Sequence, residues 1–108
     1  MINIDVLRQL ALSFPDATEA PHFDKISFRV KKKIFATLDE NTGQASLKLT
    51  PLDQSVFCAF DNSIVYPANG AWGTHGWTIF ELNKVNKGMI RDALKIAYRG
   101  VASKKSNS

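Results

Sequence analysis

The chain has 108 residues, 44% of them hydrophobic and 22% charged, a composition that predicts one globular domain and not a disordered chain. Its single cysteine, Cys58, excludes an intramolecular disulfide and any metal site built from several cysteines. The net charge of +4 is concentrated in residues 84–108, which hold seven basic residues and one acidic residue, whereas residues 1–83 have a net charge of −2. This asymmetry favours an anionic partner; a charged surface that only confers solubility is the alternative.

The first predicted element is a helix over Asn3–Leu12, because apolar residues recur on one face and Asn3 can cap the first turn. The Phe14-Pro15 pair ends this helix. A short strand over Ala17–Phe23 is expected at a sheet edge, where Pro21 is tolerated. The N-terminal third therefore predicts a helix followed by the start of a sheet.

Two hairpins are expected next. Apolar and polar residues alternate over residues 26–31, and a second strand is predicted over Ile34–Asp39, with a tight turn at Lys31-Lys32-Lys33 between them. Asn41-Thr42-Gly43 is a further turn signal, followed by an alternating strand over residues 45–50. These segments predict consecutive antiparallel strands.

A second helix is predicted to begin after Thr50, which can cap it, with Pro51 in the first helical position. It is expected to run to about Phe60. Four of its apolar residues are expected to face inward: Leu52, Val56, Phe57 and Phe60. Cys58 in this helix is interpreted as a small buried apolar residue.

The C-terminal part is expected to hold a short strand over Ile64–Tyr66, a loop over Ala68–Thr74, a last strand over Trp77–Leu82 and a helix over about Asn86–Ala102. The helix has a regular apolar stripe: Ile90, Ala93, Leu94, Ala97, Tyr98 and Val101. The predicted fold class is α+β, a largely antiparallel sheet with helices packed on one face. One domain over residues 1–102 is expected, followed by a polar, flexible tail over residues 103–108.

Four segments of the sequence resemble the MmcQ/YjbR family of small bacterial proteins. They are Pro21-His22-Phe23 with Ser27-Phe28-Arg29-Val30, Lys33-Ile34-Phe35-Ala36-Thr37-Leu38, Ser46-Leu47-Lys48-Leu49-Thr50-Pro51, and Gly70-Ala71-Trp72-Gly73-Thr74-His75-Gly76-Trp77-Thr78. The resemblance implies a "double-wing" topology, likened to the CyaY-like fold, and a DNA-binding function. Many relatives carry Lys or Arg three residues before the second tryptophan, where this chain has Thr74. A phosphate contact made by that basic residue would be missing here.

Basic residues provide the candidate nucleic-acid site. The first group is the turn Lys31-Lys32-Lys33, which in a double-wing fold would be a wing tip able to reach phosphates; a solubilising lysine turn is the alternative. Lys48 could join that surface or be an ordinary exposed strand lysine. The last helix adds a row spaced by four residues, which could equally be a solvated helix face: Lys87, Arg91, Lys95 and Arg99. No base-reading Asn or Gln lies between Lys87 and Arg99, so little sequence specificity is expected.

Trp72 and His75 are candidates for ligand binding or base stacking, because glycines flank Trp72. A tryptophan folded back over the core is the alternative. His22, His75 and Cys58 lack metal-ligand spacing, so no metal site is expected. No paired carboxylates, nucleophile with a base or phosphate-binding glycine motif is recognisable, so neither a catalytic site nor a cofactor is expected.

The sequence thus predicts a non-enzymatic, cytoplasmic bacterial protein, expected as a monomer, that binds the backbone of double-stranded DNA. No membrane segment is expected. A protein- or ligand-binding module that uses the Trp72 loop, with a pocket beside Lys48 and His75, is the second hypothesis.

Overall fold

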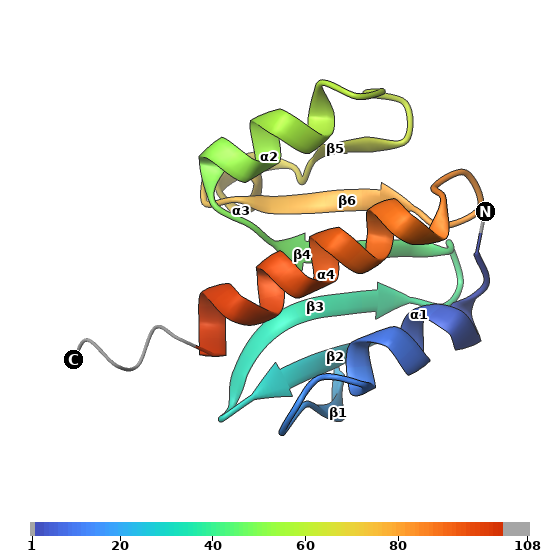
Figure 1. Ribbon diagram of the computed structural model, residues 1–108, viewed down its shortest axis with the longest axis vertical. Coiled ribbons are helices and arrows are strands. Elements are labelled where there is room, and N and C mark those ends of the chain that lie inside the picture. Colours follow the sequence, from blue (N-terminus) through green and yellow to red (C-terminus); the bar gives the residue numbers. More distant parts are fainter. Residues whose placement is uncertain (1, 103–108) are drawn as a thin grey trace.

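The computed structural model describes residues 2–102, so the expected tail over residues 103–108, with Lys104 and Lys105, lies outside the described residues. Figure 1 shows how the helices and strands of the described residues are arranged. In chain order the elements are α1 (Ile4–Leu12), β1 (Thr18–His22), β2 (Lys25–Val30), β3 (Lys33–Asp39), β4 (Gln44–Lys48), α2 (Pro51–Cys58), β5 (Val65–Pro67), α3 (Gly70–Thr74), β6 (Trp77–Glu81) and α4 (Lys87–Ala102).

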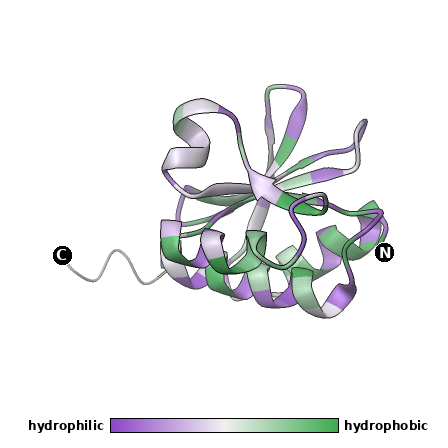
Figure 2. Cartoon of the chain, turned by 90° about the horizontal axis from the view of Figure 1, so that it is seen from above, coloured by the Kyte–Doolittle hydropathy of each residue, from purple (hydrophilic) through white to green (hydrophobic). Residues whose placement is uncertain are grey.

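The strands form one six-stranded sheet in the order β1-β2-β3-β4-β6-β5, and every neighbouring pair is antiparallel. Helices α1, α4 and α2 lie on one side of this sheet, and α3 lies on the other (Figure 2). The predicted α+β class with an antiparallel sheet is confirmed. We refer to the side away from α4 as the open face.

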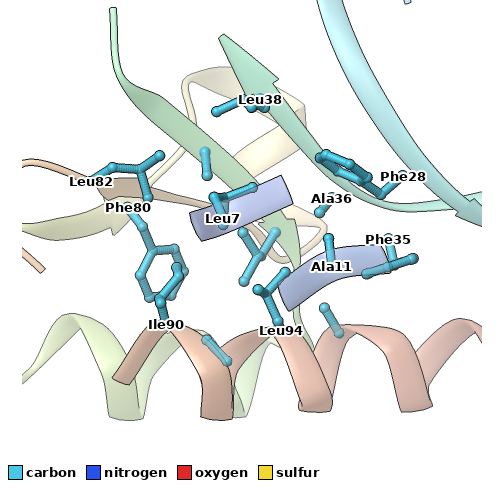
Figure 3. Packing of buried hydrophobic residues seen from close by; sticks show 14 of the residues in the cluster. Leu7, Ala11, Phe28, Phe35, Ala36, Leu38, Phe80, Leu82, Ile90 and Leu94 are labelled. Carbon is cyan, nitrogen blue, oxygen red and sulfur yellow. The ribbon is translucent and has the colours of Figure 1, made fainter. Parts of the chain in front are cut away.

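The hydrophobic core lies between the sheet and helices α1 and α4 (Figure 3). Phe28, Phe35 and Phe80 project into it from three strands and are fully buried. Helix α4 contributes the predicted stripe, with Ile90 and Leu94 fully buried and Tyr98 partly buried against the cluster. Because α4 crosses the middle of the sheet, its apolar face meets apolar side chains along most of its length.

Helix α2 differs from the sequence interpretation. Thr50 caps it as predicted, its Oγ1 accepting a hydrogen bond from the N–H of Asp53 at 3.1 Å, but the helix ends at Cys58. Three of the four apolar side chains expected inside are exposed, to 74% for Leu52, 62% for Val56 and 65% for Phe60. The expectation for these three residues was wrong: α2 packs near the sheet edge beside β5, a strand of only three residues, which offers little apolar surface.

The segment expected as a loop over Ala68–Thr74 contains the short helix α3. Asn69 in extended conformation precedes it, and Gly70 starts it with a φ of +65°, a backbone conformation that favours glycine. Gly73 is buried, and a Cβ there would lie 2.0 Å from the carbonyl oxygen of Ala68, so only glycine fits at this position. The glycines therefore let this segment fold tightly enough to project Trp72 over the open face.

Candidate functional site

The turn between β2 and β3 is the first of the predicted basic segments. Val30 pairs with Lys33, so the loop consists of Lys31 and Lys32 alone, and both have positive φ, 52° and 73°. Two consecutive positive φ values are the signature of a type I′ hairpin turn. All three lysines are exposed, at the tip of a hairpin that extends from the sheet.

Helix α4 ends beside this hairpin. Tyr98 packs edge-on against Phe35 near the start of β3, with ring centres 5.8 Å apart, and its hydroxyl donates to the carbonyl oxygen of Pro15 at 2.9 Å. Figure 1 shows the last turn of α4 and the β2–β3 turn at the same end of the sheet. Arg99 belongs to this last turn and Lys95 lies one turn earlier; both are exposed.

Lys48 ends β4 and lies at the same end of the sheet. Its Nζ donates to the carbonyl oxygen of His75 at 3.1 Å. It also lines a shallow hollow of about 200 Å³ together with Ile96 and Gly100 of α4. We call the six basic residues gathered here the basic end: Lys31, Lys32, Lys33, Lys48, Lys95 and Arg99.

The rest of the helical row extends away from the basic end. Lys87 starts α4, and twelve residues of helix separate it from Arg99, a rise of about 18 Å. Arg91 lies between the two, and both Lys87 and Arg91 are exposed. Only the second half of the predicted row thus lies beside the lysine turn.

Acidic residues gather at the opposite end of the strands. Asp39 and Glu40 lie at the turn after β3, and Glu81 ends β6. Glu81 accepts hydrogen bonds from the hydroxyl of Tyr66 and, at 2.8 Å, from the Nε2 of Gln44. The hydrogen bond to Glu81, followed by burial, raises the pKa of Tyr66.

Charge neutralisation at the basic end is limited. Within residues 2–102, no carboxylate lies within 4.0 Å of the amino groups of the turn lysines, Lys48 or Lys95. Asp53, near Lys48, is engaged by the Oγ1 of Thr50 at 3.0 Å. The lysine amino groups are therefore available to an anionic partner.

A second candidate site is a cleft of about 450 Å³ on the open face, between α3 and the β1–β2 turn. Its lining comes from five strands, helix α3 and two connections: His22, Phe23, Lys25, Ile34, Thr37, Ser46, Ala68, Asn69, Trp72 and Trp77. Trp72 and Trp77 meet edge to face, with ring centres 6.2 Å apart. Trp72 is 66% exposed and Phe23 is 93% exposed, so large apolar side chains stand at the rim of the cleft.

The cleft agrees only in part with the sequence interpretation. Trp72 lines it and does not fold back over the core. His75, predicted with Trp72, follows α3 and is exposed, and neither it nor Lys48 is among the lining residues. The pattern of the sequence did not single out Phe23, Thr37 or Ser46. The alternation along β3 and β4 places the last two on the open face, but only the strand register sets them side by side.

Other sites considered from the sequence have little support in the geometry. Among residues 2–102, no three His, Cys, Asp or Glu side chains gather in a way that could hold a metal ion. Cys58 is only partly buried, and that burial raises the pKa of its thiol. None of the helices in the part of the chain that the structure describes is long and apolar enough to cross a bilayer.

Comparison with known proteins agrees with this architecture. The YjbR family model matches residues 12–100. The chain belongs to the YjbR family. The fold is similar to that of the Deinococcus radiodurans protein DR2400, whose crystal structure contains a DUF419 domain: the TM-score is 0.85 at 22% identity, over 97% of this chain and 82% of that one. No curated protein matches the chain.

Proposed function

We propose that this YjbR protein is a non-enzymatic DNA-binding protein that contacts the phosphate backbone of duplex DNA through its basic end. The observation that carries the proposal is the convergence of separate segments. A hairpin tip, the end of β4 and the second half of α4 bring six basic residues toward one end of the sheet. Backbone phosphates are bound by such clusters of Lys and Arg without base readout.

The charge separation along the strands supports the same function. The basic end lies opposite the end that carries Asp39, Glu40 and Glu81. Glu40 is paired with Arg8 at 3.6 Å. Lys84 and Lys87 lie at the same end, so the orienting field comes mainly from the basic end. Lys87, at the far end of α4, is expected to contribute less than Lys95.

The structure offers a variant that removes charge from the turn and keeps its conformation. Lys31→Asn with Lys32→Gly replaces both turn lysines by Asn-Gly, the pair that best suits a two-residue turn with positive φ. Fluorescence anisotropy with a labelled duplex, measured at several salt concentrations, should show weaker binding. Because each phosphate contact contributes about −0.9 to the slope of log K against log salt, the loss of two contacts should make this negative slope shallower by about 2.

The matched control removes two lysines outside the basic end, Lys25→Gln with Lys84→Gln, and should leave the salt slope nearly unchanged. Adding Lys95→Gln to the turn variant should weaken binding further. Equal weakening by the control pair would show that only net charge matters and would refute the assigned surface. An absence of any duplex binding by the wild type at low salt and tens of micromolar protein would refute the function.

A further inference from the structure

We propose that the cleft on the open face binds an uncharged, planar heteroaromatic molecule of one or two fused rings. None of its ten lining residues belongs to the basic end, so this site is independent of the proposed DNA surface. A volume of about 450 Å³ falls within the range of about 300–1,000 Å³ that is usual for small-molecule sites.

The walls of the cleft favour a flat ligand. The indoles of Trp72 and Trp77 stand at 77° to each other, so a ring that stacks on one meets the edge of the other. His22 and Phe23 form a second edge-to-face pair at the rim, with ring centres 4.8 Å apart. Offset stacking and edge-to-face contacts are the preferred arrangements of aromatic rings.

The floor of the cleft carries unused hydrogen-bonding groups. Thr37 and Ser46 are direct cross-strand partners in β3 and β4, and both line the cleft. No hydrogen bond within residues 2–102 engages either hydroxyl, and neither is sealed from solvent. Each hydroxyl can donate and accept, so the pair suits adjacent donor and acceptor atoms at the edge of a heterocycle.

The charge around the cleft favours an uncharged ligand. Lys25 is the one formally charged residue of the lining, and Asp24 lies 4.0 Å from its Nζ. A nucleic-acid strand that stacked its bases here would need a positive groove to follow its backbone. The lining lacks such a groove, so the ligand is a free ring compound and not part of a polymer.

The two tryptophans provide a local probe. Trp72 and Trp77 are the only tryptophans in the chain, so both indole N–H resonances in an amide correlation NMR spectrum report on the cleft. Titration with quinazolin-4-one should shift both resonances to saturation, with a dissociation constant below about 1 mM. Cyclohexanecarboxamide, which has an amide but no planar ring, should shift neither.

Variants separate the floor from the walls. Thr37→Val with Ser46→Ala preserves the shape and removes both hydroxyls, and it should weaken quinazolin-4-one about tenfold. Trp72→Ala should weaken quinazolin-4-one binding at least about tenfold, because it removes one aromatic stacking contact. The indole N–H resonance of Trp77 remains to report on binding in this variant. Phe60→Ala, an exposed apolar change two residues after α2, should leave binding unchanged.

Several outcomes would overturn the inference. One is the absence of any shift in either indole resonance up to several millimolar quinazolin-4-one. Equal binding by cyclohexanecarboxamide, or by the Thr37→Val and Ser46→Ala double variant, would remove the role of ring or floor. Shifts caused by single-stranded oligothymidylate but not by quinazolin-4-one would assign the cleft to a polymer instead.

Discussion

Helices α4 and α2 both carry apolar residues at helical spacing, but α4 is the more amphipathic of the two, and their environments in the fold differ. The stripe of α4 is buried, with Leu94 and its neighbours fully enclosed between helix and sheet. Leu52 and Val56 of α2 and Phe60 just after it are mostly exposed. Phe57 and Cys58 pack on the core, and Phe57 lies edge to face with Phe80 at 5.9 Å. Amphipathic periodicity thus indicates that a face can be buried, whereas burial depends on what the fold places opposite that face.

The two helices differ in the surface available to them. Helix α4 crosses β2, β3 and β4, and these strands carry large core side chains such as Phe28 and Phe35. Helix α2 packs mainly against β5, which has three residues and ends the sheet. A short edge strand cannot cover a helix face of two turns, so the outer side of α2 stays in solvent.

The largest expected difference is between the same substitution in the two helices. Leu94→Ala should lower the free energy of unfolding by about 2–5 kcal/mol, because it removes a fully buried side chain from a packed core. Leu52→Ala should change it by less than about 0.5 kcal/mol. Urea unfolding followed by circular dichroism measures both. Equal losses in the two variants would mean that α2 is covered in solution.

Phe57 in α2 and Phe60 just after it should differ in their contributions to stability, because Phe57 faces the core and Phe60 faces solvent. Phe57→Ala should cost about 2 kcal/mol, since a half-buried ring contributes less than a fully buried one. Phe60→Ala should cost less than about 0.5 kcal/mol. Thermal and urea unfolding measure the loss of stability in both variants. A larger loss for Phe60→Ala than for Phe57→Ala would mean that α2 is rotated about its axis.

Removing the cap of α2 and removing the cap of α4 should lower the free energy of unfolding by similar, smaller amounts. Thr50 accepts from the N–H of Asp53 in α2, and the Oδ1 of Asn86 accepts from the N–H of Met89 at 2.8 Å in α4. Thr50→Ala and Asn86→Ala should each cost about 1 kcal/mol, because capping is local and does not depend on core packing. Thr50→Ser should retain the cap and the stability, which urea unfolding can verify.

The smallest effect concerns the turn after α2. Asp61 Oδ1 accepts from the Oγ and the N–H of Ser63 at 2.7 and 2.9 Å, and these hydrogen bonds hold the pKa of Asp61 below its ordinary value of 3.8. A lowered folded pKa means that the stabilisation is complete above pH 3.8 and is lost as the pH falls through the folded value. Carboxyl carbon NMR shifts measured against pH should show this, and Ser63→Ala should move the pKa of Asp61 upward.

Local rules predicted much of the fold correctly. Asn3 and Thr50 cap their helices, Gly43 supplies the positive φ of its hairpin turn, and α4 carries its stripe as expected. These features depend on residues close together in the sequence. Helix α3 was missed because four of its five residues are glycine, alanine or threonine, which carry little periodic signal.

The candidate sites divide in the same way. The exposure of Lys31-Lys32-Lys33 and of the basic row followed from the sequence, because charge and turn position are local properties. The separation of Lys87 from the basic end required the direction of α4 across the sheet. The lining of the cleft required the register that pairs Thr37 with Ser46 and the close approach of α3 to the β1–β2 turn.

By itself, the sequence determined the α+β class, the order of most elements and the concentration of positive charge in the C-terminal quarter. Only the tertiary structure decided which apolar helix face is buried, which lysines share a surface and which side chains form a cleft. The physical reason is that caps, turns and periodicity depend on neighbours within a few residues. Burial and clustering depend on strands and helices that pair over long separations, such as Phe35 with Tyr98.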